Sequence, residues 1–527
     1  MRKVLIITAC LLTAVSANAQ ETYDNANIAT QDLNGTARYV GMGGAMDALG
    51  ADISTISSNP AGIGLFRSST ASASFGFTAQ QDAKTFADAD KVNMSFDQIG
   101  FVYAKRTGSK SFLNLAFNYH KSRNFNQILS AADRLKGASQ NKLSYMKGYE
   151  GLFDIHQSNN GDYVANSNTF NQVDYLYYNV LMPEIDENGQ ATFYYNDAAE
   201  YLFNRSTSGY IGEYDFNISG NINDRVYLGL TFGIHDVNYK GYSEYSEILI
   251  NGSDNVGDVV LTDERRIDGA GFDLKAGVIF RPLENNPLRI GLSVATPIWY
   301  DLTSTNYTVL NNYTKVGLYE KASISESYDF KLYTPWRFGL SVGTTFGKNI
   351  AIGAGYEFAD YGSLDSRIND GGYYDWYWDD YYETSSSDKE MNRHAERTLK
   401  GVSTFKIGAE YKPISELAFR LGYNYVSAMY DEDGYKDVSL DSPGTYYTSS
   451  TDYTNWDATH RLTLGVGYTL GKFQMDAAYQ YSAQKGDFSP FTNYYAADAS
   501  SSDNNICNPK SVENNRHQLL VTLGYRF

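Results

Sequence analysis

Apolar and polar residues alternate with a period of two along many segments of this chain. In the last segment the apolar residues fall on one face of an extended strand, at Leu519, Val521, Leu523, Tyr525 and Phe527. A period of two is typical of a β-strand with one apolar and one polar face. We find fourteen such segments, many with Tyr or Phe near an end: 69–80, 97–106, 111–125, 209–223, 226–240, 265–282, 288–302, 328–346, 350–362, 399–414, 417–430, 459–471, 473–485 and 515–527.

The connections between these segments alternate in length. Six are short, at 107–110, 223–225, 284–287, 347–349, 415–416 and 471–472, whereas the longest connection runs from about 126 to 208. Short turns at one end and long loops at the other are typical of outer-membrane β-barrels, whose even strand number places both termini in the periplasm. The pattern therefore predicts an all-β fold: a 14-stranded antiparallel transmembrane β-barrel over residues 69–527.

The N-terminus has the features of a secretory signal peptide. Arg2 and Lys3 precede an apolar stretch at 4–15, and Ala17, Asn18 and Ala19 form an A-x-A cleavage site. A lipoprotein signal ending at Cys10 is the competing interpretation, but its apolar stretch before the cysteine is short. We expect residues 1–19 to be removed on export, which leaves Cys507 as the single cysteine and no internal disulfide.

Composition excludes two other classes of protein. No apolar run of 18 residues follows the N-terminus, and the mean hydropathy is -0.42, which argues against membrane-spanning helices. The formal net charge of -18 argues against a nucleic-acid partner. Tyrosine is abundant, at 46 residues, as expected where aromatic side chains border a membrane.

Residues 20–68 precede the first strand and lack a strand pattern. They are rich in glycine and alanine, residues 45–57 fit a short helix, and Asn59 before Pro60 suits a helix N-cap followed by proline at the first helical position. With both chain ends at the periplasmic side, we predict that this segment fills the barrel lumen as a plug, or hatch.

The hatch segment resembles that of the FadL/TodX family of outer-membrane transporters for long-chain fatty acids and aromatic hydrocarbons. The resemblance lies in Ala37-Arg38, in Gly41-Met42-Gly43-Gly44-Ala45, in Asp52 and in the box Asn59-Pro60-Ala61-Gly62. It extends less strongly to 334–340 and 407–411. The long loops, rich in Tyr, Asn, Asp and Ser, resemble those of Bacteroidota members of the family, some of which are labelled hemin receptors.

The resemblance implies a mechanism and a set of site residues. A hydrophobic ligand would dock among the extracellular loops, enter the upper lumen and leave sideways into the membrane when the hatch moves. Hatch gating would involve Arg38, Asn59, Pro60, Ala61 and Gly62. The third loop, near 241–264, carries apolar residues suited to a ligand groove: Ile248, Leu249, Ile250, Val259, Val260 and Leu261. In the family the lateral opening lies at a kink in the third strand, yet no proline or glycine marks a kink in 111–125.

Several alternatives stay open at this stage. The barrel could be a passive porin for small polar solutes, or a hemin- or glycan-binding adhesive barrel whose aromatic loop at 371–383 contains Trp376 and Trp378. We expect no enzyme activity, no cofactor and no metal, since the six histidines lack H-x-x-H or H-E-x-x-H spacing. Charged lumen residues of both signs are expected to pair with one another.

The expected partners follow from the same interpretation. They are a hydrophobic small molecule, outer-membrane lipid and the barrel-assembly machinery, which would read the strand ending at Phe527. We expect a monomer and no nucleic acid.

Overall fold

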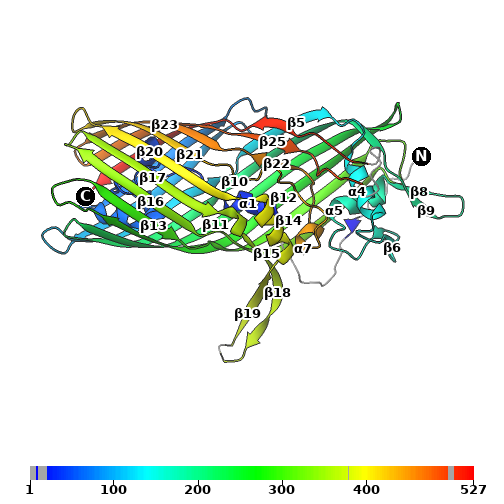
Figure 1. Ribbon diagram of the computed structural model, residues 1–527, viewed down its shortest axis with the longest axis horizontal. Coiled ribbons are helices and arrows are strands. Elements are labelled where there is room, and N and C mark those ends of the chain that lie inside the picture. The colour runs from blue at the N-terminus through cyan, green and yellow to red at the C-terminus, as the bar shows by residue number, and fades with distance from the viewer. Residues whose placement is uncertain (1–7, 10–20, 378, 497–503) are drawn as a thin grey trace.

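A closed antiparallel barrel of fourteen strands forms the body of the molecule (Figure 1). The computed structural model describes residues 8–9, 21–377, 379–496 and 504–527. Strand β2 pairs with both β3 and β27, which closes the barrel, and the predicted strand count is confirmed. In order around the wall, the strands are β2 (Thr70–Gln80), β3 (Val92–Arg106), β4 (Phe112–Asn124), β10 (Asp197–Ile222), β11 (Val226–Asn251), β12 (Asp254–Phe280), β13 (Arg289–Ala295), β16 (Arg337–Phe346), β17 (Ile350–Asp360), β20 (Gly401–Tyr411), β21 (Leu417–Val426), β23 (Thr459–Leu470), β24 (Phe473–Ala483) and β27 (Arg516–Arg526).

The outer surface of the barrel is apolar and its lumen is polar. Along β23, Leu462 and Leu464 are each 51% exposed, whereas Thr463 between them is fully buried on the lumen side. Outward aromatic residues lie near the strand ends, with Phe473 and Tyr525 at the end that has short turns and Tyr479 at the other. An apolar exterior with aromatic residues near its edges is the surface of a barrel that spans a bilayer. Among the described residues, no helix is long and apolar enough to cross a membrane.

Three strands are much longer than the membrane requires. A transmembrane strand needs about 10 residues, yet β10 has 26, β11 has 26 and β12 has 27. The expected loop at 241–264 is therefore wrong: these residues continue β11 and β12, and only a tight turn separates them. The predicted strands at 288–302 and 328–346 are each broken at a proline, which cannot donate to the ladder. Pro297 separates β13 from β14 (Trp299–Asn312), and Pro335 separates β15 (Lys321–Tyr333) from β16.

A packed cap covers the barrel at the end opposite the short turns (Figure 1). Its core joins α4 (Gln140–Tyr149) and α5 (Gln172–Val180) to the long strands and to β5 (Gln127–Arg134), which pairs with β10. The remaining small elements of this region are β6 (His156–Gln157), β7 (Tyr163–Val164), β8 (Pro183–Ile185), β9 (Ala191–Phe193), α7 (Pro443–Tyr446), β22 (Tyr453–Trp456), β25 (Lys485–Ser489) and β26 (Lys510–Glu513).

The stability of the cap should depend on Glu247. This residue lies 21 positions after Val226, the first residue of β11, and so is well beyond the membrane. Its carboxylate accepts hydrogen bonds from the Gln140 backbone at 2.7 Å and from the Tyr245 hydroxyl at 2.5 Å. Burial raises the pKa of Glu247 from 4.5 to about 7. Because the pKa is raised, the contribution of Glu247 to the stability of the cap is fully present below pH 4.5 and is lost as the pH rises through 7.

We therefore expect hydrogen exchange in α4 to accelerate between pH 5 and pH 8.5 beyond the intrinsic pH effect. A shift of this size corresponds to a loss of protection on the order of 100-fold. The variant Glu247→Gln, an isostere of the protonated acid, should flatten the dependence. Equal pH dependence in both proteins would contradict the assignment.

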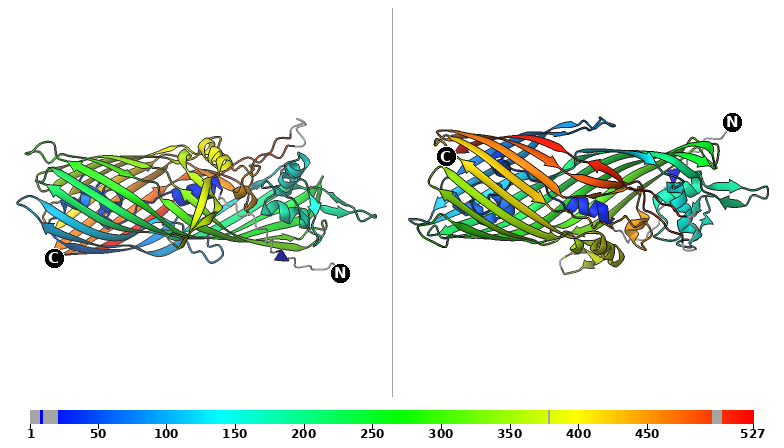
Figure 2. Two further views of the ribbon diagram at one scale, coloured as in Figure 1. Left: turned by 90° about the horizontal axis from the view of Figure 1, so that it is seen from below. Right: turned by 45° about the horizontal axis from the view of Figure 1, so that its top comes forward.

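A β-hairpin, a short 3-10 helix and an α-helix leave the wall near its middle. Strands β18 (Asp365–Asp375) and β19 (Asp380–Ser387) project sideways from the barrel (Figure 1) and point toward the viewer in the left view of Figure 2. Helix α6 (Lys389–Thr398) contacts η2 (Tyr361–Ser363) at the base of the hairpin. The expected aromatic loop at 371–383 is thus a projecting β-hairpin. Its Trp376 is 88% exposed, and Trp378 lies outside the described residues.

The N-terminal segment lies inside the barrel, as predicted, but with little helix. It contains α1 (Thr22–Ala29), α2 (Ala37–Gly41), α3 (Thr55–Ser58) and η1 (Pro60–Leu65). The helix expected over 45–57 is wrong except for α3, because Gly50 and Ala51 both have positive φ and interrupt it. The Asn59 cap is present: its side chain accepts from the Ala61 backbone, and Pro60 begins η1. The predicted signal peptide lies outside the described residues except for β1 (Thr8–Ala9), which runs parallel to β15.

Candidate functional site: the hatch, the lumen cavity and a break in the wall

Glycines on the lumen face of the wall allow the hatch to lie directly on the strands. A Cβ at Gly408 would overlap the carbonyl oxygen of Met42, and one at Gly353 would overlap that of Ala45. On β23, Gly465 faces Gly41 of α2 in the same way, with 3.3 Å between its added Cβ and the Gly41 Cα. All three contacts are with main-chain atoms of the hatch, so a side chain at Gly353, Gly408 or Gly465 would push the hatch away from the wall.

The Asn-Pro-Ala-Gly box is held by side chains that reach from the wall to its backbone. Ser219 donates to the Pro60 carbonyl at 2.9 Å, and Asn114 donates to the Ile63 carbonyl at 2.6 Å. Asn59, Pro60, Ala61 and Gly62 are all buried. A Cβ at Gly62 would overlap Thr55, which explains the glycine. The box is therefore a docking element of the hatch on β4, β10 and β11.

Arg38 anchors the other half of the hatch. Its guanidinium donates to the Ala51 carbonyl at 2.9 Å and pairs with Glu410 on β20 at 3.2 Å. Glu410 also pairs with Arg420 on β21 at 2.7 Å, and Arg420 pairs with Asp476 at 2.6 Å. The lumen charges thus pair across strands, as the sequence predicted.

The wall is interrupted between β3 and β4. The two strands pair from Arg106 and Phe112 up to Gln98 and His120, and the ladder ends there. Each strand carries a β-bulge at this level, at Asp97 in β3 and at Ser122 in β4. A bulge bends a strand without proline or glycine, which is why the sequence of 111–125 shows no marker for a kink.

Hatch residues occupy this interruption. The Asp32 amide donates to the Ser122 carbonyl at 2.7 Å, in place of a neighbouring strand. Asn34 donates both to the Asp97 carboxylate at 3.0 Å and to the Lys121 carbonyl at 3.1 Å. Residues 32–34, which we name the latch, therefore hold the free edges of β3 and β4 together.

Above the latch, Gln80 closes the interruption. Its side chain both donates to and accepts from the Ile128 backbone of β5, at 2.7 and 2.8 Å. The wall thus contains a window, bounded below by the Gln98–His120 pair, above by Gln80 and filled by the latch.

A lumen cavity of about 340 Å³ adjoins the window. Its lining is amphipathic: aromatic and aliphatic residues include Tyr23, Phe125, Val402, Met429, Tyr430 and Trp456. Six arginines also line it, and three of them, Arg123, Arg461 and Arg516, lie near Asp32. Among the described residues, Asp32 pairs with Arg123 at 3.1 Å and with Arg461 at 3.8 Å, and no carboxylate lies within 4 Å of Arg516. We name these three residues the arginine trio.

On the outer side of the wall, the cavity meets a cleft of about 730 Å³. Thr78, Gln127, Thr207, Arg265 and Arg516 are among the residues that line both. Cavity and cleft thus approach each other on either side of the window.

The predicted ligand groove is not a loop groove in this structure. Leu249, Val259 and Leu261 point into the cap core and are buried, whereas Ile248, Ile250 and Val260 lie half-buried on the same strands. Their apolar character reflects packing of the cap. A role for these six residues in ligand binding stays a prediction.

Comparison with known proteins gives similarity in structure only. No family model matches the sequence, and no curated protein matches it. Solved structures similar to the chain include a Pseudomonas aeruginosa FadL homologue, at 10% identity over 94% of this chain and 99% of that chain, with a TM-score of 0.48. The Pseudomonas putida toluene transporter TodX is similar at 10% identity over 95% and 100%, with a TM-score of 0.47. The Ralstonia pickettii toluene transporter TbuX is similar at 12% identity over 94% and 99%, with a TM-score of 0.45. The FadL/TodX family, which the hatch segment resembles, is named after FadL and TodX.

Sequence reasoning did not single out the latch or the arginine trio. Asp32 and Asn34 stand in the hatch segment without a distinctive motif, and the trio comes from β4, β23 and β27. The available signal was the inward position of Arg461 and Arg516 on strands whose outward residues alternate with them.

Proposed function

We propose that the protein is a bacterial outer-membrane transporter that takes up hydrophobic compounds carrying an anionic head group, with long-chain fatty acids as the first candidates. The short turns and Phe527 would face the periplasm, and the cap would face the outside. The observation that supports this most is the combination of an amphipathic lumen cavity with a latch-filled window in a wall whose exterior is apolar.

The ligand would leave through the wall and not through the base of the barrel. The hatch is packed against glycines all round the lower lumen, whereas the window is closed by the latch, by Gln80 and by a hydrogen bond of 2.9 Å from Lys121 to Ser95. Release into the membrane keeps the hydrocarbon chain out of water, which would cost about 0.8 kcal/mol per CH₂. Movement of residues 32–34 would free the edges of β3 and β4 and open the window.

The arginine trio favours an anionic ligand over a neutral hydrocarbon. Three guanidinium groups around Asp32 leave a local excess of positive charge in the cavity, and a ligand carboxylate could pair with them bidentately. A neutral aromatic hydrocarbon could stack on a guanidinium group but could not neutralise its charge. A passive porin is disfavoured, because the hatch fills the lumen that a polar solute would cross.

Native mass spectrometry of the detergent-purified barrel tests the ligand class. With oleate, an aromatic hydrocarbon and hemin offered separately, we expect a one-to-one oleate adduct. Arg516→Gln should weaken it by about tenfold or more, the value of a hydrogen bond to a charged group. The surface variant Arg393→Gln, whose side chain is exposed on α6, should bind as the wild type does.

Other outcomes would redirect the assignment. Binding of the hydrocarbon with no preference for oleate would remove the role of the arginine trio. Binding of hemin alone would indicate capture of that cofactor, and no adduct at all would contradict the proposal.

A further inference from the structure

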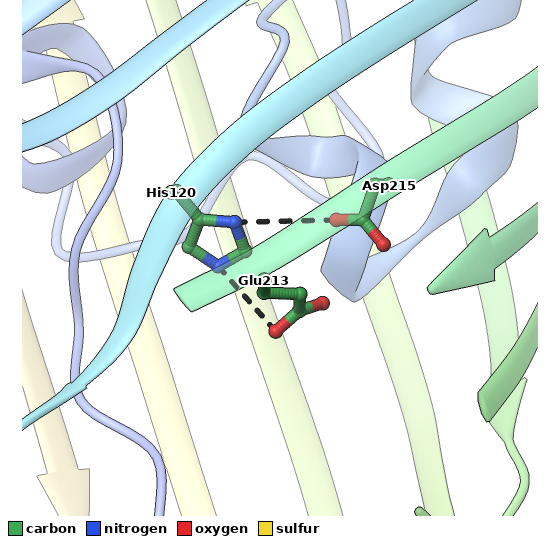
Figure 3. Close-up of side chains that lie close together, drawn as sticks. All are labelled: His120, Glu213 and Asp215. Atoms are coloured by element: carbon green, nitrogen blue, oxygen red, sulfur yellow. Dashed lines mark ion pairs between the residues drawn. The ribbon is translucent and has the colours of Figure 1, made fainter. Parts of the chain in front are cut away.

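A row of titratable side chains crosses three neighbouring strands at the foot of the window. His120 on β4 lies directly opposite Glu213 on β10, and Glu213 lies directly opposite His235 on β11. All three are buried on the lumen side, together with Asp215 two residues further along β10. Figure 3 shows His120, Glu213 and Asp215. His120 is also the last residue of β4 that pairs with β3.

Within the described residues, His120, Glu213 and Asp215 form the one group of side chains whose spacing suits a metal ion. Their potential ligand atoms all lie within 4.8 Å of one another. His120 Nε2 lies 3.7 Å from Glu213 Oε2, and His120 Nδ1 lies 4.0 Å from Asp215 Oδ2 (Figure 3). Two ligands of a tetrahedral zinc ion are about 3.4 Å apart, so binding would draw these atoms, now up to 4.8 Å apart, together by up to about 1.4 Å.

The two carboxylates present one oxygen to a lysine and the other to the histidine. Lys275 Nζ lies 2.8 Å from Glu213 Oε1, 2.9 Å from Asp215 Oδ1 and 2.8 Å from Asp273 Oδ1. Glu213 Oε2 and Asp215 Oδ2 are turned toward His120 instead. The ammonium group therefore orients the carboxylates without occupying the side that faces the imidazole.

Buried polar atoms without a hydrogen-bond partner gather at this site. They include Asp215 Oδ2 and His235 Nδ1, in side chains that are fully buried, whereas His235 Nε2 lies 3.2 Å from Asp273 Oδ1. His235 Nδ1 lies 3.8 Å from Glu213 Oε2, the same oxygen that faces His120. Buried polar groups almost always have a partner, so the atoms converging on this point indicate a ligand that accepts lone pairs.

The charge balance favours a bound cation. The ion pairs at the site join three carboxylates, of Glu213, Asp215 and Asp273, to two basic groups, of Lys275 and Arg337. This leaves a net formal charge of -1 when both histidines are neutral. An uncompensated buried charge is costly, and a bound divalent ion would offset it.

We propose that His120, Glu213 and Asp215 bind a first-row divalent transition metal of the Zn²⁺, Mn²⁺ and Fe²⁺ class, with His235 beside it. One imidazole and two carboxylates are donors that these ions share, whereas Ca²⁺ and Mg²⁺ prefer oxygen alone. His120 also lines the lumen cavity, which gives the ion an access route. By joining β4 to β10, the metal would fix the lower border of the window. The proposal does not depend on the identity of the transported ligand.

Metal analysis of the tag-free, detergent-purified protein tests the proposal. After incubation with Zn²⁺ or Mn²⁺ and removal of excess ion, we expect about one equivalent per chain. His120→Asn and Glu213→Gln should each weaken binding by about 100-fold or more, at least the effect of losing an outer-shell partner. The control His156→Gln, in the exposed strand β6, should retain the metal. Heat-modifiable migration shows that each variant has folded.

Cobalt substitution of the wild-type protein gives a readout that needs no variant. Bound Co²⁺ should give visible d–d absorption, which Zn²⁺ should abolish by competition. Less than about 0.1 equivalent of metal together with no cobalt spectrum would overturn the proposal, and would leave protonated histidines as the balancing charge. Full metal retention by both ligand variants would overturn it as well.

Discussion

Replacing Gly353 and Gly408 together by alanine is expected to dislodge the hatch and turn a closed barrel into an open channel. Each added methyl would overlap a backbone carbonyl oxygen of the hatch, of Ala45 and Met42 respectively. Neither the wall strands nor the tight turns of residues 42–49 can yield easily, so the overlap should cost about 1–3 kcal/mol at each position. The hatch has no core of its own beyond small clusters such as Leu33, Met42, Met46 and Leu49.

Single-channel conductance in planar bilayers measures this effect. The wild type should be nearly silent, and the double variant should show long open events. If the two overlaps together cost about 3 kcal/mol, the population with a docked hatch falls by about 100-fold. A matched control is Gly355→Ala with Gly524→Ala, because the nearest atoms to those added methyls lie at 3.4 and 3.6 Å, which is ordinary contact. Equal conductance in both double variants would show that the hatch does not depend on these contacts.

The barrel itself could be predicted from the sequence because its signal is repeated and local. Each strand alternates between lipid and lumen, so Leu462, Thr463 and Leu464 already show the period on their own. The Asn59–Pro60 cap was equally local. In contrast, β11 and β12 extend well beyond the predicted segments at 226–240 and 265–282, and the alternation of buried residues continues through Tyr245, Glu247 and Leu249.

The candidate metal site could not be predicted in the same way, because it depends on the register between strands. His120 and His235 are 115 positions apart in the chain, yet both lie opposite Glu213. Spacing rules for metal ligands within one segment cannot detect such a row. The window was hidden for a related reason: the bulges at Asp97 and Ser122 arise from pairing offsets and not from any residue type.

Holding the hatch in place should abolish uptake if its movement opens the window. Ala37, three residues after the latch, donates its amide to the Thr522 hydroxyl of β27 at 2.7 Å. Because this contact holds the two residues against one another, Ala37→Cys with Thr522→Cys should lock the hatch to β27 on oxidation. Cys507 should not interfere, since it is buried and burial raises the pKa of its thiol to about 12.

The most direct test of hatch-gated release is the uptake of labelled oleate by cells carrying this double variant, oxidised and then reduced. A matched control, Thr469→Cys with Gln474→Cys, joins two facing wall residues of β23 and β24 without involving the hatch. We predict that the oxidised hatch variant loses uptake by about tenfold or more, as expected when a gating motion is blocked. Reduction should restore uptake, and the control should transport in both states. Undiminished uptake with the hatch covalently fixed to β27 would contradict the account.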